Sequence, residues 1–231
     1  MIFRQLFDQE TWTYTYLLAD EKSQEAVLID PVAEQVERDV KLLEELGLRL
    51  KYVFDTHVHA DHVTANGTLR TRTGCQTGVS EKGGADCVDL QLKEGDQFSF
   101  GAHQLKVLET PGHTEGCLSF VCGDKVFTGD SLLIRGCGRT DFQQGDAGML
   151  YDGVTKKLYA LPDQTWVYPG HDYRGMSVTT IAEEKAHNPR MRLGREAFID
   201  FMANLNLPHP KKIHEAVPAN LVCGQAVEKT A

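Results

Sequence analysis

The first half of the chain alternates between two hydrophobic periodicities. Alternating or continuous apolar positions in short runs are typical of strands, whereas apolar residues spaced three and four apart are typical of an amphipathic helix. Residues 34–47 have the helical spacing, and Gly47 supplies a C-terminal stop. The apolar run 50–56 predicts a buried strand, and 63–74 predicts a helix after it. Three earlier strands are expected at residues 2–7, 13–19 and 25–30.

The second half repeats this order of strands followed by helices. Helical periodicity returns at 149–161, and the segment after it carries one more strand and two further helices before a Pro-rich polar tail begins after Leu207. Two such halves permit an α/β fold with two sheets face to face and helices outside, an αββα four-layer sandwich, although periodicity alone also fits other α/β arrangements. Strands are expected at 75–80, 96–101, 103–110, 117–123, 125–130 and 165–170, and the last helices at 178–188 and 195–205.

Composition narrows the class of protein. The chain has 231 residues, of which 41% are hydrophobic and 25% charged, so we expect a single domain over 1–231 with a short helical C-terminal extension from about residue 175. No apolar run is long enough to cross a membrane, and no signal or transit segment is visible, which predicts a cytoplasmic protein with no membrane partner. The net charge of −9 and the lack of a basic cluster argue against a nucleic-acid partner, because phosphate binding needs a basic surface.

The six cysteines show no CxxC and no regular spacing. In a chain of this length without a signal segment, this pattern predicts reduced, mostly buried thiols. Cys137 and Cys223 are both interpreted in this way, because a nucleophilic cysteine requires a nearby activating group that the sequence cannot show.

Four short segments place a His or Asp at the end of a strand-like run. Imidazole and carboxylate ligands suit zinc, iron or manganese, and no cysteine occurs in these segments. A single histidine of this kind is more often a surface or hydrogen-bonded residue. Three imidazoles and a carboxylate within "HVHADH" are costly to bury without a cation, so metal binding is favoured. The candidates are His57, His59, Asp61, His62, His113, Asp130 and His171.

These segments, in the order "THVHADH", "TPGHT", "FTGD" and "YPGHDY", resemble the signature of the metallo-β-lactamase superfamily. The resemblance covers nearly the whole chain and implies the αββα sandwich with a metal site at one edge between the sheets. The run "DSLLIRGCGRTDFQQGD", with "YPGHDYRG" and the C-terminal "NLNLPHPKKI" and "AVPANLVCG", resembles the persulfide dioxygenases, which are non-haem iron enzymes of sulfide oxidation.

Membership of that branch implies one Fe²⁺ per chain, held by His57, His113 and Asp130. This two-histidine, one-carboxylate set leaves coordination positions open for a substrate and O₂. The implied reaction converts glutathione persulfide, O₂ and water to sulfite and glutathione, and family members are often homodimers. Seven candidate ligands are also enough for two ions. The motifs alone therefore leave open a glyoxalase II-like thiolester hydrolase with a dinuclear centre, or a module whose closed metal site only stabilises the fold.

The remaining site residues follow from the same resemblance. Tyr173 and Arg190 are implied in substrate binding. Arg139 is expected to give structural support near the site by pairing with a carboxylate such as Asp141 or Asp172. The other four candidate ligands become second-shell or proton-handling residues, or a polar network inherited from a two-metal ancestor. These four are His59, Asp61, His62 and His171.

Overall fold

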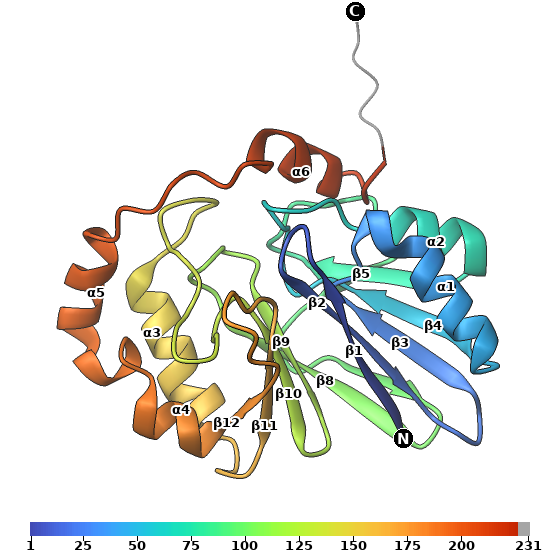
Figure 1. Cartoon of the computed structure of the whole chain (residues 1–231), viewed down its shortest axis with the longest axis horizontal. Helices are drawn as coiled ribbons and strands as arrows, with labels where there is room; N and C mark the ends of the chain where they lie inside the picture. Colours follow the sequence, from blue (N-terminus) through green and yellow to red (C-terminus); the bar gives the residue numbers. More distant parts are fainter. Residues whose placement is uncertain (226–231) are drawn as a thin grey trace, which may run out of the picture.

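The computed structural model describes residues 1–225 and contains two six-stranded sheets with helices on their outer faces (Figure 1). The N-terminal sheet has the order β1-β2-β3-β4-β5-β6 and the C-terminal sheet the order β12-β11-β10-β9-β8-β7. The strands of the first sheet are Ile2–Asp8, Thr13–Ala19, Glu25–Ile29, Arg49–Phe54, Gln76–Ser80 and Leu90–Leu92. Those of the second, β7 to β12, are Gln97–Phe100, His103–Glu109, Leu118–Cys122, Lys125–Gly129, Trp166–Pro169 and Thr179–Thr180.

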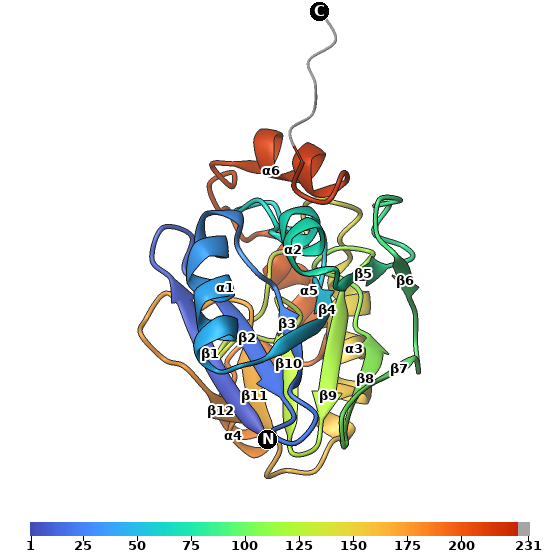
Figure 2. The same cartoon turned by 90° about the vertical axis from the view of Figure 1, so that its right-hand side faces the viewer.

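Six α-helices complete the described fold. Helices α1 and α2 lie beside the first sheet, whereas α3 and α4 lie beside the second and α5 packs on the outside of α3 (Figures 1 and 2). Their bounds, from α1 to α6, are Val36–Glu45, Asn66–Thr73, Ala147–Lys156, Ile181–His187, Arg195–Ala203 and Ile213–Asn220.

Three apolar clusters separate four layers. The central one joins inward side chains of both sheets, such as Tyr16 and Phe54 from the first and Phe120 from the second. A second cluster packs α1 and α2 on the outer face of the first sheet, and a third packs α3, α4 and α5 on the second. Strands of a sheet that is covered on both faces must be apolar on both sides, which explains why β2 is buried at every position. The predicted αββα sandwich is confirmed.

The direction of the strands decides where the site forms. β3, β4 and β5 are mutually parallel, and in the other sheet β10 is parallel to β11 and antiparallel to β9, which is antiparallel to β8. The carboxyl ends of β8, β10 and β11 therefore reach one edge of their sheet. Ligands in α/β folds commonly lie at such strand ends.

Three features of the fold were wrongly predicted or missed. The helix expected over 178–188 begins only at Ile181, because Thr179 and Thr180 form β12 against β11 and Thr180 caps α4 with its side chain. The short strand β6 was not expected. The polar tail after Leu207 contains α6, which was not predicted because Pro218 lies inside this helix.

The prediction for the cysteines was wrong at one pair. Cys87 and Cys223 form a disulfide across 136 residues, whereas Cys75, Cys117, Cys122 and Cys137 are free and buried as expected. The sequence could not reveal this pair, because only the docking of the segment after α6 beside the 81–89 loop brings the two sulfurs together.

Candidate metal centre

Three candidate ligands from separate strands face one point. His57 follows β4, His113 follows β8 and Asp130 follows β10, and one ligand atom of each lies within 4.8 Å of the others. The rings of His57 and His113 stand at 85° with centroids 4.9 Å apart, and Nε2 of His113 lies 3.6 Å from Oδ2 of Asp130. Two imidazoles and a carboxylate are the donor types of the facial set that holds non-haem iron in other proteins.

Hydrogen bonds fix the tautomers of both histidines. Nδ1 of His113 lies 2.7 Å from the carbonyl of Arg139, which can only accept, so Nδ1 carries the proton and Nε2 has a free lone pair. The Thr56 hydroxyl donates to Asp30 at 2.9 Å and so accepts from Nδ1 of His57 at 3.0 Å. In each ring the Nδ1 atom is used by this hydrogen bond, and the Nε2 atom is left free to bind a cation, as in metal-binding histidines.

Asp30 is the buried carboxylate behind the "HVHADH" segment. It follows β3 in a left-handed conformation, with φ of 52°, and accepts from the Thr56 amide at 2.6 Å and from Nε2 of His59 at 3.1 Å. Burial raises its pKa, although His57 and the bonds from Thr56 oppose the shift. Burial and neighbouring imidazoles also lower the pKa values of His57 and His59 well below the usual range, which keeps both rings neutral and able to bind a cation.

A second group lies beside the first. Ligand atoms of His59, Asp61 and His62 lie within 4.8 Å of one another, and Asp61 accepts from Nδ1 of His62 at 3.1 Å. His171 joins both groups, with its Nε2 3.5 Å from Asp61 and 3.7 Å from Asp130. Burial opposes the charged form of Asp61, but His171 and His62 hold its pKa well below the usual value.

A buried asparagine from α6 supports this segment from behind. The Asn220 side chain donates to the carbonyls of His59 and His62, both at 2.9 Å, and accepts from the Thr64 amide at 2.8 Å. The segment that carries most of the candidate ligands is therefore held by a residue about 160 positions later in the chain.

Two glycines let backbone approach the ligands closely. A Cβ on Gly138 would lie 2.6 Å from the carbonyl oxygen of Asp130 and 2.8 Å from the His113 ring. A Cβ on Gly170 would lie 2.9 Å from Oδ1 of Asp130. The second glycine in "GCGRT" and the one in "YPGHDY" thus have a steric reason to lack side chains.

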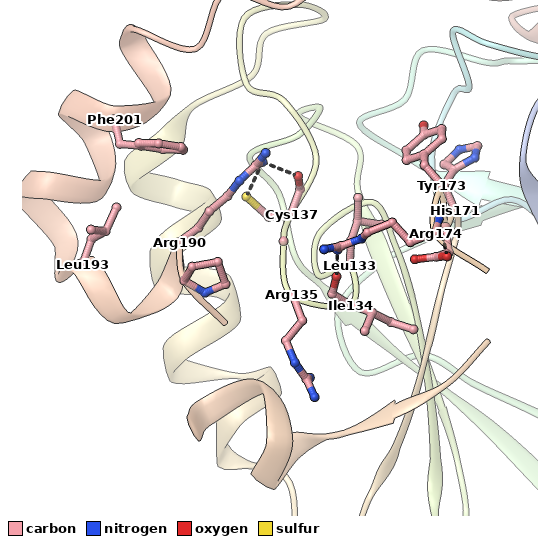
Figure 3. A pocket seen from close by; sticks show the side chains of 13 residues that line it. Leu133, Ile134, Arg135, Cys137, His171, Tyr173, Arg174, Arg190, Leu193 and Phe201 are labelled. Atoms are coloured by element: carbon pink, nitrogen blue, oxygen red, sulfur yellow. Dashed lines mark hydrogen bonds between the residues drawn. The ribbon is translucent and has the colours of Figure 1, made fainter. Parts of the chain in front are cut away.

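A pocket of about 580 Å³ opens onto the centre and is lined by His113, Asp130 and His171 together with residues of the C-terminal segment. Tyr173 and Arg190 line it and also line an adjoining pocket of about 500 Å³ (Figure 3). The Tyr173 ring stacks on His171 at 6.0 Å, and 62% of Tyr173 is exposed. Arg190 donates to the carbonyl of Cys137 at 2.8 Å, and its guanidinium lies 5.7 Å from the Phe201 ring.

The expected supporting residues make specific contacts. Arg139 forms a two-pronged pair with Asp141, at 2.7 and 2.8 Å, and also donates to the carbonyl of Pro208 at 2.7 Å. Among residues 1–225, the polar partners of Arg139 do not include Asp172, which instead accepts from the amides of Arg174 and Met176, at 2.8 and 2.7 Å. Arg139 thus ties the loop after β10 to the chain segment that precedes α6.

The residues present fit a bound cation. Among residues 1–225, three buried side-chain atoms of the two groups lack a hydrogen-bond partner: Oδ1 of Asp130, Nδ1 of His59 and Nε2 of His62. Unpaired buried acceptors cost free energy; a cation between His57, His113 and Asp130 would offset this cost at Asp130, and a water molecule or a second cation would do so at the two nitrogens. The donor set of imidazole nitrogen and carboxylate oxygen, without thiolate, suits iron, zinc or manganese.

The metallo-beta-lactamase superfamily model matches residues 13–171, and the chain belongs to this superfamily. It is 52% identical to "Persulfide dioxygenase ETHE1, mitochondrial" of Mus musculus, over 97% of this chain and 89% of the relative. The crystal structure of ETHE1 from Myxococcus xanthus superposes with a TM-score of 0.95 at 58% identity, covering 97% of this chain and 100% of that one. These relatives confirm the predicted branch.

A hydroxyacylglutathione hydrolase of Roseobacter denitrificans is 34% identical over 76% of this chain and 69% of that protein. In residues 1–225, no helix is long and apolar enough to cross a membrane.

Sequence reasoning missed three residues that hold the ligands in place, namely Asp30, Thr56 and Asn220. Asp30 and Thr56 each end or follow a strand-like run, as the candidate ligands do. Asp30 stands in none of the four motifs, and a threonine such as Thr56 is not a usual metal ligand. Asn220 lies in the segment that was interpreted as a polar tail, so no local pattern pointed to it.

Proposed function

We propose that this chain is a non-haem Fe²⁺ persulfide dioxygenase acting on glutathione persulfide. The observation that carries the proposal is the 52% identity to a named persulfide dioxygenase across 97% of the chain, with the candidate ligand set complete. In the reaction, persulfide, O₂ and water give glutathione, sulfite and two protons. The outer sulfur loses four electrons and O₂ gains them, so no further reductant is needed.

His57, His113 and Asp130 would hold one iron per chain. The bound iron would supply open coordination positions and the electron-transfer chemistry that O₂ requires and that protein side chains lack. The protein keeps Nε2 of both histidines unprotonated through Thr56 and the Arg139 carbonyl. Ligand orientation and charge are thereby set before substrate enters.

His59, Asp61, His62 and His171 orient water and accept protons beside the reacting sulfur. The geometric support is the pair of unpartnered buried nitrogens, Nδ1 of His59 and Nε2 of His62, each able to accept a hydrogen bond from water. Asp61 fixes the tautomer of His62 through the 3.1 Å hydrogen bond from Nδ1. These residues handle water and protons and leave the ferrous ion to the other group.

Tyr173 and Arg190 bind the glutathione part of the substrate. Both line the pocket that opens onto the ligands, and Arg190 offers a guanidinium that pairs with carboxylates in two-pronged fashion. The net charge of −9 makes such local cations necessary for an anionic substrate. Arg139 and Asp141 support the loop that carries Gly138 against His113, and Asp172 closes the turn after His171.

A glyoxalase II-like thiolester hydrolase with two metal ions is the second candidate. The second ligand group and the 34% identity to a hydroxyacylglutathione hydrolase favour it. Both candidates use glutathione, so substrate class does not separate them. O₂ consumption does, because hydrolysis at a dinuclear centre requires only water.

The decisive experiment is O₂ uptake by protein purified without oxygen, on addition of glutathione persulfide. We expect substrate-dependent uptake with sulfite as product, and no hydrolysis of S-lactoylglutathione. Asp130→Ala should lose iron and activity, whereas Asp124→Ala, an exposed residue beside β10, should keep both. Thiolester hydrolysis without O₂ uptake would instead establish the hydrolase.

We also infer that residues 1–231 act as a single domain whose helical extension begins near residue 175, and that the active form is a homodimer. Light scattering on the eluting protein measures its mass. A mass of one chain would contradict the dimer.

A further inference from the structure

Trp12 occupies an unfavourable backbone conformation at the tip of the hairpin between β1 and β2. Its φ is 61°, in the left-handed region that bulky side chains rarely adopt, and 45% of the residue is exposed. The turn is fixed by Asp8, which accepts from the amide and hydroxyl of Thr11 at 2.9 and 2.7 Å. Strain of this kind persists where the surroundings over-determine it, and it is concentrated at functional sites.

The same turn is attached to the metal centre. Nδ1 of His171 donates to the carbonyl of Trp12 at 3.3 Å, and the next residue, Thr13, forms a β-bridge with His171. The amide of Tyr14 donates to the carbonyl of Gly170 at 2.8 Å. The indole is therefore held at a defined position relative to the candidate ligands rather than on a free loop.

The indole is part of a row of aromatic rings at the pocket. Trp12 lines the pocket that contains His113 and Asp130, and its ring lies 6.3 Å from Tyr173, which stacks on His171. The Phe7 ring also meets the Trp12 ring edge-on, at 6.0 Å and 70°. Trp12 and Tyr173, whose rings are tilted by 49° to each other, thus give the pocket an aromatic wall beside the candidate ligands.

A substrate that fits this wall has a reactive end that reaches Asp130 and a planar, extended body outside. Glutathione persulfide has such a shape: the sulfur chain enters, and two peptide planes with terminal carboxylates remain in the pocket. Peptide planes pack well on aromatic faces, and the carboxylates have Arg190, Lys211 and Lys212 within the same pocket lining.

We propose that the indole of Trp12 is a specificity-determining contact that packs against the peptide body of glutathione persulfide and distinguishes it from smaller persulfides. This inference rests on the proposed function. The contact is made equally in the ground state and the transition state, because the peptide body does not react. Trp12 therefore acts on KM and leaves kcat unchanged.

Steady-state O₂ uptake with two substrates tests the contact. Trp12→Leu should raise the KM for glutathione persulfide about tenfold, the usual effect of losing an aromatic packing partner, with kcat unchanged. Trp12→Phe should raise KM much less. Both variants keep a Cβ and so keep the backbone strain, which leaves the ring as the difference. Cysteine persulfide, which lacks the peptide arms, should show the same KM in all three proteins.

Fluorescence gives a readout independent of turnover. The chain has two tryptophans, and Trp166 lies exposed at the start of β11, five residues before His171. In Trp166→Phe, where Trp12 is the single reporter, glutathione added without oxygen should change the emission in a saturable way. In Trp12→Phe, where Trp166 remains, the same titration should leave the emission unchanged.

The outcomes separate this inference from the proposed function. If the unaltered protein takes up O₂ with glutathione persulfide but Trp12→Leu has the same KM, the contact is refuted and the proposed function stands. A flat fluorescence titration in Trp166→Phe likewise refutes the contact. If the unaltered protein takes up no O₂ with either persulfide, the proposed function fails, whatever glutathione does to the emission of Trp12.

Discussion

Replacing Asn220 by alanine removes the link between α6 and the segment that carries His59 and His62. The side chain is buried and makes three hydrogen bonds to backbone, two at 2.9 Å and one at 2.8 Å. Alanine leaves two carbonyls and the Thr64 amide without these partners. Since the neighbouring residues are themselves buried, water cannot readily replace the lost bonds.

The expected cost follows from those three bonds. A hydrogen bond contributes about 1 kcal/mol, and a buried partner left unpaired costs about 1–3 kcal/mol, so the unfolding free energy should fall by about 3–5 kcal/mol. For a chain of this size, that corresponds to a fall in Tm of roughly 10 °C. Iron affinity should change far less than the about 10- to 100-fold that follows loss of a ligand's own hydrogen-bond partner, because the side chain of Asn220 bonds only to the backbone of His59, His62 and Thr64.

Urea unfolding of the metal-free protein measures the first effect without the stabilisation that a bound ion adds. Competition with a chelator then measures the affinity for Fe²⁺. Asn204→Ala is the matched control, because Asn204 is exposed and its side chain donates only to the carbonyl of Asp200, at 2.8 Å. Equal unfolding free energies for the two variants would refute the supporting role of Asn220.

Three further changes have distinct expected outcomes. Thr56→Val removes the hydroxyl that fixes the tautomer of His57 and should lower Fe²⁺ affinity about tenfold in chelator competition; unchanged affinity would contradict this role. Burial raises the pKa of Asp39 to about 6, so the native state binds the proton of this carboxyl more tightly than the unfolded state does. The unfolding free energy should therefore fall as pH rises from about 4 to about 6, by at most about 3 kcal/mol. Urea unfolding at about pH 4 and at about pH 6 should show this loss of unfolding free energy in the unaltered protein but not in Asp39→Asn. An equal pH dependence in the two proteins would contradict the raised pKa of Asp39. Cys87→Ser should lower the unfolding free energy by about 2–5 kcal/mol, because it removes the disulfide. In the protein of unaltered sequence, denatured without a reductant, four thiols should react with a thiol reagent, and six would exclude the bond to Cys223.

The parts of the fold with strong local periodicity could be predicted from the sequence. The helix at 34–47 and the strand at 13–19 each have a regular apolar pattern, and the structure places α1 and β2 there. Two short elements lacked such a pattern. β12 is only two residues long and exists because β11 pairs with it, and α6 contains a proline and buries only Ala216 and Asn220.

The candidate ligands could be found because each stands in a short motif at a strand end. The residues that orient them could not, because their roles depend on contacts across the fold. Asp30 acts on His59 across 29 residues, and Asn220 acts on the same residue across 161. The Cys87–Cys223 bond is of the same kind. The left-handed backbone of Trp12 also has no local sequence signal, since that conformation is normally left to glycine or asparagine.

Metal analysis of active protein purified without oxygen tests the central claim most directly. One iron per chain, lost on replacing His57, His113 or Asp130 and retained on replacing His62, is the predicted result. Two ions per chain in fully active protein, with the second lost on replacing His62, would contradict a single ferrous centre.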